Sequence, residues 1–141
     1  MLSLSSFIDK IYLLVRDISD AFEHLWALFY VKIYLLIILL TNILNWSLVY
    51  WVVGKISNSY DDIIILHYNV DFGVSLIKKV GWFYVIPLLG SIISIINFLL
   101  LIFVYNHKDR KFIAHLLFST TILVNIFLLF GIIAIFLVNY F

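Results

Sequence analysis

Residues 33–53 read IYLLIILLTNILNWSLVYWVV and contain no Asp, Glu, Lys or Arg over 21 positions. About 20 apolar residues suffice for an α-helix to cross the ~30 Å hydrocarbon core of a bilayer. Lys32 and Lys55 bracket the stretch, and long basic side chains in such places can extend into the head groups. The stretch therefore predicts a first membrane-spanning helix.

Two further uncharged stretches follow it, residues 82–105 and residues 112–138. The first contains Pro87 near its start, where a helix tolerates proline. The second is longer than a span requires, so we expect it to tilt or to begin in the interface. The polar turn 106–111 between them is short enough for an antiparallel hairpin. The sequence predicts an all-α membrane protein with three transmembrane helices.

The composition agrees with a lipid environment. Hydrophobic residues make up 65% of the 141 residues and charged residues 12%, against about 45–50% and 25% in soluble domains. One water-soluble core of this size could not bury so much apolar surface. The net charge of +1 gives no polyelectrolyte signal for nucleic acid, and the absence of cysteine excludes thiolate metal sites. We expect the lipid bilayer as a partner, and neither nucleic acid nor a cofactor.

Residues 1–30 carry an amphipathic helical pattern. Apolar residues recur at alternating spacings of four and three, and most charged residues fall elsewhere on the helix. Such a helix can lie in the membrane interface with its apolar face down, and the same stripe would suit a coiled-coil seam with a partner. Both alternatives stay open from the sequence. The stripe consists of Leu4, Ile8, Ile11, Val15, Ile18, Phe22, Leu25 and Phe29.

Basic residues near short loops predict the orientation. Lys10, Arg16, Lys32, Lys108, Arg110 and Lys111 would lie on one side of the membrane, and Lys55, Lys78 and Lys79 on the other. The excess predicts a multi-pass protein of the cell membrane with a cytoplasmic N-terminus and an extracytoplasmic C-terminus. The loop 54–81 would then lie outside, with a short extended piece at 63–68, a turn at 69–73 and a helical turn after it.

Polar residues recur near the middle of each expected span. An amide in hydrocarbon costs several kcal/mol if it is unpaired, so each should find a partner. The structural interpretation is that these residues form contacts between helices. The functional interpretation is that they line a path for a polar ligand or an ion. We expect contact between helices, because no charged residue accompanies the amides. The candidates for these contacts are Asn42, Asn45, Gly90, Ser94, Asn97, Thr121 and Asn125.

The loop contains the most distinctive local string, formed by His67, Tyr68, Asn69, Asp71, Phe72 and Gly73. His67 and Asp71 could supply a base and a carboxylate, or two metal ligands. A zinc site needs three or four ligands at known spacings, which this string does not offer. We interpret it as a fixed loop at the head-group level. With no catalytic motif in the chain, we expect neither a metal site nor an enzyme.

The string Leu66-His-Tyr-Asn-Val-Asp-Phe-Gly-Val, followed by Ile86-Pro-Leu-Leu-Gly90, resembles a group of small uncharacterised membrane proteins of candidate-phylum bacteria with reduced genomes. Those proteins have a His-Tyr-Asn-x-x-Phe-Gly stretch before a span with Pro and Gly near its start. The resemblance covers about residues 63–138 and implies a topology, but no activity.

Two functions are compatible with these features. The first is an interaction or accessory subunit of a membrane assembly. Its partners would be other membrane proteins or further copies of the same chain. The second is a small oligomeric channel, transporter or holin-like pore lined by the asparagines.

Overall fold

The computed structural model describes residues 4–56, 63–69 and 73–140. Three of its helical segments are long and apolar enough to cross a membrane: Phe29–Lys55, Val80–Phe103 and Arg110–Asn139. A further helix precedes them, so the predicted fold class is confirmed. The elements in chain order are α1 (Leu4–Ala27), α2 (Phe29–Ile56), β1 (Ile63–Asn69), β2 (Gly73–Lys79), the 3-10 helix η1 (Val80–Tyr84), α3 (Val85–Phe103) and α4 (Arg110–Tyr140).

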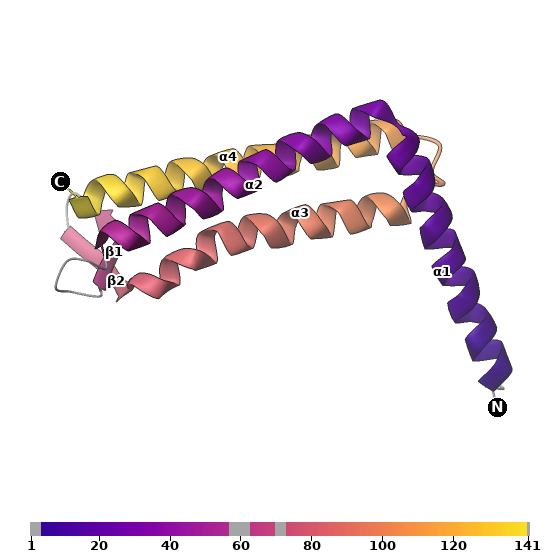
Figure 1. Cartoon of the computed structure of the whole chain (residues 1–141), viewed down its shortest axis with the longest axis horizontal. Helices are drawn as coiled ribbons and strands as arrows, with labels where there is room; N and C mark the ends of the chain where they lie inside the picture. The colour runs from indigo at the N-terminus through magenta and orange to yellow at the C-terminus, as the bar shows by residue number, and fades with distance from the viewer. Residues whose placement is uncertain (1–3, 57–62, 70–72, 141) are drawn as a thin grey trace.

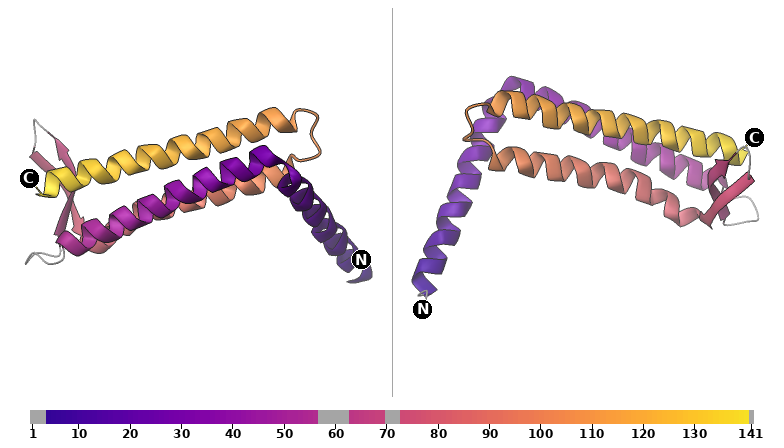
Figure 2. Two further views of the ribbon diagram at one scale, coloured as in Figure 1. Left: turned by 45° about the horizontal axis from the view of Figure 1, so that its top comes forward. Right: turned by 180° about the vertical axis from the view of Figure 1, so that it is seen from behind.

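The helices α2, α3 and α4 lie side by side, and α1 runs across the end of this bundle (Figure 1). α4 packs against both α2 and α3. The two strands lie at the opposite end, next to the C-terminal end of α4, as both views in Figure 2 also show. α1 and the 104–109 connection therefore share one end of the bundle, which we call the α1 end, and the strands mark the hairpin end.

Two helices, α2 and α4, extend beyond the uncharged stretches that predicted them, whereas α3 ends at Phe103, two residues before the expected end of the second span. α2 begins at Phe29 and ends at Ile56, and α4 covers Arg110–Tyr140. Hydropathy identifies only the part of a helix that lies in hydrocarbon, whereas backbone hydrogen bonding continues through the interface. At the other boundary, α1 ends at Ala27 instead of residue 30, and Leu28 separates it from α2.

The loop before α3 is a β-hairpin. β1 pairs antiparallel with β2 from Ile63 opposite Lys79 to Asn69 opposite Gly73, with register shifts around His67. The extended piece at 63–68 was predicted, but the second strand was not, because residues 74–77, expected only to connect the turn to a helical turn, belong to β2. Val74 and Ile77 are β-branched, and pairing with β1 satisfies their backbone groups. The helical turn comes later, as η1, which also contains the expected start of the second span at Trp82.

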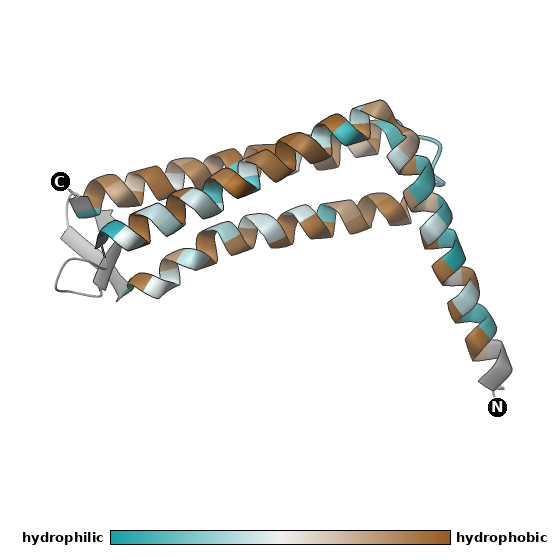
Figure 3. Ribbon diagram, viewed as in Figure 1, coloured by the Kyte–Doolittle hydropathy of each residue, from teal (hydrophilic) through white to brown (hydrophobic). Residues whose placement is uncertain are grey.

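Two apolar clusters hold the bundle together, one near each end. The hairpin-end core consists of Val49, Val52, Val80, Phe83 and Ile132. The α1-end core consists of Leu25, Val31, Ile38, Leu101, Ala114 and Phe118. Large apolar side chains such as Leu36 and Phe127 remain exposed on the outside, and Figure 3 shows how strongly hydrophobic colours dominate the three long helices. In lipid such a surface is solvated and does not need to be buried.

Paired tryptophan and lysine side chains mark both ends of α2. The Nζ atom of Lys32 lies 5.7 Å from the centre of the Trp26 ring, and that of Lys55 lies 6.0 Å from the centre of the Trp51 ring. At 1.5 Å per residue, Lys32 and Lys55 are about 35 Å apart along the helix. This separation fits a hydrocarbon core of ~30 Å between two belts of aromatic and basic side chains.

Candidate functional site

The polar residues of the three long helices form a layer between the two apolar cores. Its most buried part joins α2 to α4. The side-chain amide of Asn45 donates to the backbone oxygen of Asn125 at 3.1 Å and to its Oδ1 at 3.3 Å. Asn125 in turn donates through Nδ2 to the carbonyl oxygen of Thr121 at 3.0 Å, within α4. Asn45, Thr121 and Asn125 are all fully buried, so these hydrogen bonds form without competition from water.

A second part of the polar layer joins α3 to α4. Asn97 donates through Nδ2 to the hydroxyl of Thr121 at 2.8 Å, and this hydroxyl donates to the carbonyl oxygen of Leu117 at 2.8 Å. Asn125 also lies 3.4 Å from the hydroxyl of Ser94, at the long limit for such a bond. Asn125 therefore contacts side chains of both other helices.

The third part of the layer joins α2 to α3 and includes two residues that the sequence analysis did not single out. Asn42 donates to the hydroxyl of Ser94 at 3.1 Å and accepts from that of Ser91 at 3.1 Å. The indole Nε1 of Trp46 donates to Ser91 at 3.1 Å. Trp46 follows Asn42 by four residues and Ser91 precedes Ser94 by three, so helical spacing was the available signal.

Gly90 lies where α3 packs tightly against side chains of α4. A Cβ atom at this position would lie 2.6 Å from Oδ1 of Asn125 and 3.1 Å from Cδ1 of Leu128. Asn125 cannot move away freely, because the same Oδ1 accepts a hydrogen bond from Asn45. The structure thus brings together all seven residues considered for helix–helix contact, with Gly90 providing space and the other six providing hydrogen bonds.

We expect Gly90→Ala to destabilise the bundle by about 1–3 kcal/mol, the range for an overpacked core. The added methyl group must displace the Asn125 side chain and so weaken its bond to Asn45. Unfolding in mixed micelles with increasing dodecyl sulfate, followed by circular dichroism, measures the change. Gly131→Ala is the matched control, since no neighbouring atom of the described residues lies within 4 Å of a Cβ atom there. Equal stability of the two variants would contradict a tight contact at Gly90.

One atom of the polar layer has no partner. Among the described residues, Oδ1 of Asn45 is the buried side-chain oxygen or nitrogen that lacks a hydrogen bond. An unsatisfied buried acceptor costs about 1–3 kcal/mol. Asn45 therefore contributes through its amide donor alone, and its carbonyl reduces the net gain.

The hairpin contains part of the loop string. The backbone of His67, Tyr68 and Asn69 forms the end of β1, and Gly73 begins β2. Asp71 and Phe72 lie outside the described residues. Within the described ranges, no group of three or more His, Cys, Asp or Glu side chains could hold a metal ion.

At the α1 end, His115 forms an aromatic cluster that sequence reasoning missed. Its Nδ1 lies 3.1 Å from the hydroxyl of Tyr34, within hydrogen-bond distance. The ring centres of Tyr30 and Tyr34 lie 5.0 and 5.5 Å from the ring centre of His115. Tyr34 also stacks on Phe118. The cluster ties the start of α2 to α4 next to the α1-end core.

The rotation of α1 about its own axis follows from three contacts with the bundle. Leu25 packs into the α1-end core and is 3% exposed. Phe22 lies edge-on to Phe98, inside the span of α3, with ring centres 6.2 Å apart. The ring centre of His24, on the polar side of α1, lies 6.4 Å from the ring centre of Tyr105, which follows the end of α3. The apolar stripe of α1 is therefore directed toward the spanning part of the bundle, and its polar side toward the connection.

Most of that stripe is free of contacts that would bury it. Ile8, Ile11, Val15 and Phe22 are between 45% and 58% exposed. The colours of Figure 3 show hydrophilic residues between the apolar ones along much of α1, more often than along the long helices. A helix across the end of a bundle, with its apolar side toward the spans, has the geometry of an interfacial helix.

No protein-family model, curated protein or solved structure matches this chain. The class must therefore be taken from the fold itself. Three long apolar helices and a helix lying across their end define a small multi-pass membrane protein.

Proposed function

We propose that this protein is a non-enzymatic interaction or accessory subunit of an assembly in the cell membrane. The observation that carries the proposal is α1, which lies across the end of the bundle with most of its apolar stripe exposed and directed toward the spans. We assign this stripe to the bilayer. The opposite side of α1, which includes Asp9, Arg16, Asp20 and Glu23, then faces water and is available to a protein at the membrane surface.

The hydrogen bonding of the polar layer supports this proposal over a pore. Asn42, Asn97 and Asn125 each bond to a neighbouring helix of the same chain. Bonds of this kind stabilise helix pairs by about 0.6–2 kcal/mol each. A conducting path would instead require polar groups that turn away from such bonds and line a shared channel.

The distribution of basic residues supports a cytoplasmic N-terminus. Both α1 and the 104–109 connection lie at the α1 end (Figure 2). Six basic residues belong to these segments and to the adjoining ends of α2 and α4. The hairpin end has fewer, with Lys55 at the end of α2 and Lys78 and Lys79 in β2. By the positive-inside rule, the α1 end is cytoplasmic and the hairpin end with the C-terminus is outside.

Single-cysteine variants test role and orientation together, because the natural chain has no cysteine. An impermeant maleimide should label Lys79→Cys in intact cells, and Glu23→Cys only in inside-out vesicles. A photo-crosslinker on Glu23→Cys should yield one discrete crosslinked protein. The same crosslinker on Tyr50→Cys, which is 74% exposed on the spanning part of α2, should yield lipid adducts instead.

Two results would overturn the proposal. One is a Glu23→Cys crosslink to lipid alone. The other is solute or ion flux in proteoliposomes of the purified protein that Asn97→Leu reduces, because flux of this kind would assign the polar layer to a conducting path.

A further inference from the structure

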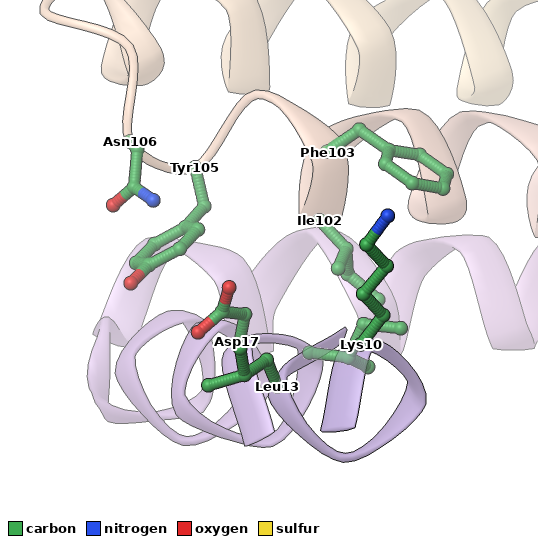
Figure 4. Close-up of a pocket in the computed structure, with 8 residues that line it drawn as sticks. Lys10, Leu13, Asp17, Ile102, Phe103, Tyr105 and Asn106 are labelled. Atoms are coloured by element: carbon green, nitrogen blue, oxygen red, sulfur yellow. The ribbon is translucent and has the colours of Figure 1, made fainter. Parts of the chain in front are cut away.

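A pocket of about 390 Å³ lies between α1 and the end of α3. Figure 4 shows it between side chains of α1 and those at the end of α3 and in the connection after it. The lining combines apolar side chains with one cation, one anion, a phenol hydroxyl and an amide. The residues are Lys10, Leu13, Asp17 and Ile18 from α1, and Ile102, Phe103, Tyr105 and Asn106 from the other side.

We propose that this pocket binds a zwitterionic phospholipid, whose phosphate faces Lys10 and whose protonated amine faces Asp17. The proposal rests on the interfacial position of α1 in the proposed function. At that position the pocket lies where α3 leaves the hydrocarbon, which is the level of lipid head groups.

The spacing of the two charges fits a head group that carries both signs. Lys10 and Asp17 are seven residues apart, which places them on the same side of α1 and about 10 Å apart along its axis. Within the described residues, no ion pair joins them. In Figure 4 the Lys10 amine lies near Phe103 and the Asp17 carboxylate lies toward Tyr105, and both side chains line the pocket. A ligand with a phosphate and an amine can bridge these charges, whereas a purely anionic one would be repelled by Asp17.

The apolar part of the lining fits the rest of a phospholipid. Leu13 and Ile18 of α1 and Ile102 of α3 form apolar walls beside the charged groups. Phe103 is 73% exposed, next to the Lys10 side chain. A soluble phosphorylated amine would leave these walls in water, whereas a phospholipid covers them with its glycerol and acyl groups.

The rest of α1 argues against an anionic lipid. Its polar face has three further acidic residues, Asp9, Asp20 and Glu23, and one further basic residue, Arg16. Anionic head groups are attracted by clusters of basic residues, and this face has the opposite balance. A head group with no net charge is not repelled by it.

The test uses the purified full-length protein, solubilised from liposomes that contain equal amounts of phosphatidylethanolamine, phosphatidylglycerol and phosphatidylcholine. Mass spectrometry quantifies the lipids that remain bound. We expect phosphatidylethanolamine to be enriched over phosphatidylglycerol about two- to fivefold, the effect of one partly exposed ion pair. Asp17→Asn should return this ratio to one, and Lys10→Gln should lower total bound phospholipid.

Asp9→Asn and Arg16→Gln are the matched controls, because each removes a charge of the same sign from α1 outside the pocket lining. Both should retain the enrichment of the natural protein, and circular dichroism verifies that all four variants keep their helix content. Equal enrichment in Asp9→Asn and Asp17→Asn would overturn the proposal, as would enrichment of phosphatidylglycerol. Displacement of the lipid by inorganic phosphate as readily as by phosphoethanolamine would also overturn it, since the site would then be a simple anion site.

Failure of this site and failure of the accessory role give different results. Lipid enrichment is measured without any protein partner, so a missing Glu23→Cys crosslink leaves it unaffected. Conversely, a protein crosslink at Glu23→Cys together with no lipid enrichment would remove the lipid site and retain the accessory role.

Discussion

Phe83→Ala is expected to lower the free energy of unfolding by about 3 kcal/mol, the lower end of the range for a buried phenylalanine. Phe83 is fully buried in η1, where it packs in the hairpin-end core with Val49 and Val52 of α2 and Ile132 of α4. Its removal leaves a cavity where three elements meet. We choose the lower end because an unfolded membrane chain still keeps much of its apolar surface in lipid, so mainly the packing contribution is lost.

Phe127→Ala is the control for this variant. It makes the same change on α4, where the side chain is 64% exposed on the outside of the bundle. Titration with dodecyl sulfate in mixed micelles, followed by circular dichroism, should show a much smaller loss of stability for it. Equal losses from the two variants would mean that Phe83 is not packed as the structure shows.

The sequence predicted where the spans lie but not how they face each other. The stretches 33–53 and 112–138 lie within segments that the structure identifies as long apolar helices, and the stretch 82–105 overlaps the remaining such segment up to Phe103. In lipid, however, apolar residues are favourable both inside and outside the bundle, so hydropathy carries no information on rotation about the helix axis. For α2 the rotation follows from a few residues, such as Asn45, which is fully buried, while neighbouring Leu44 is 50% exposed.

The candidate site was predictable as a set of residues but not as a network. The cost of an unpaired amide in hydrocarbon indicated that Asn42, Asn45, Asn97 and Asn125 need partners. The partner of each depends on relative rotation and depth of three helices, which one sequence does not determine. Trp46 was not singled out for this reason, because the sequence alone does not place Ser91 of another helix opposite its indole.

For the N-terminal helix, unlike the spanning helices, the sequence pattern does indicate which side faces the apolar environment. α1 lies between two different environments, so its stripe was visible in the sequence as a periodic pattern. The structure adds that the stripe is not uniform, because Leu25 is buried in the α1-end core whereas Ile8 and Val15 are more than half exposed. The contact of Phe22 with Phe98 then orients the stripe, and no local pattern could predict it.

Asn125→Leu is expected to destabilise the bundle by about 2–3 kcal/mol. Asn125 accepts from Asn45 through Oδ1 and contacts Ser94, and bonds of this kind contribute about 0.6–2 kcal/mol each in a membrane. Leucine removes both, but the backbone oxygen of residue 125 can still accept from Asn45. Thr120→Val is the control on the same helix, since the Thr120 hydroxyl is exposed and bonds to the carbonyl oxygen of Leu116 in its own helix.

A double-mutant cycle with Asn45→Leu separates direct contact from general loosening. If the two amides interact as the structure shows, the double variant should lose less than the sum of the two single losses, by about 1 kcal/mol. Removing Asn45 also removes its unpaired carbonyl, so Asn45→Leu should be the milder single change. Strict additivity would mean that the amides act independently. A stable Asn125→Leu protein that had lost ion flux would assign these amides to a conducting path, and the structural role of the polar layer would have to be abandoned.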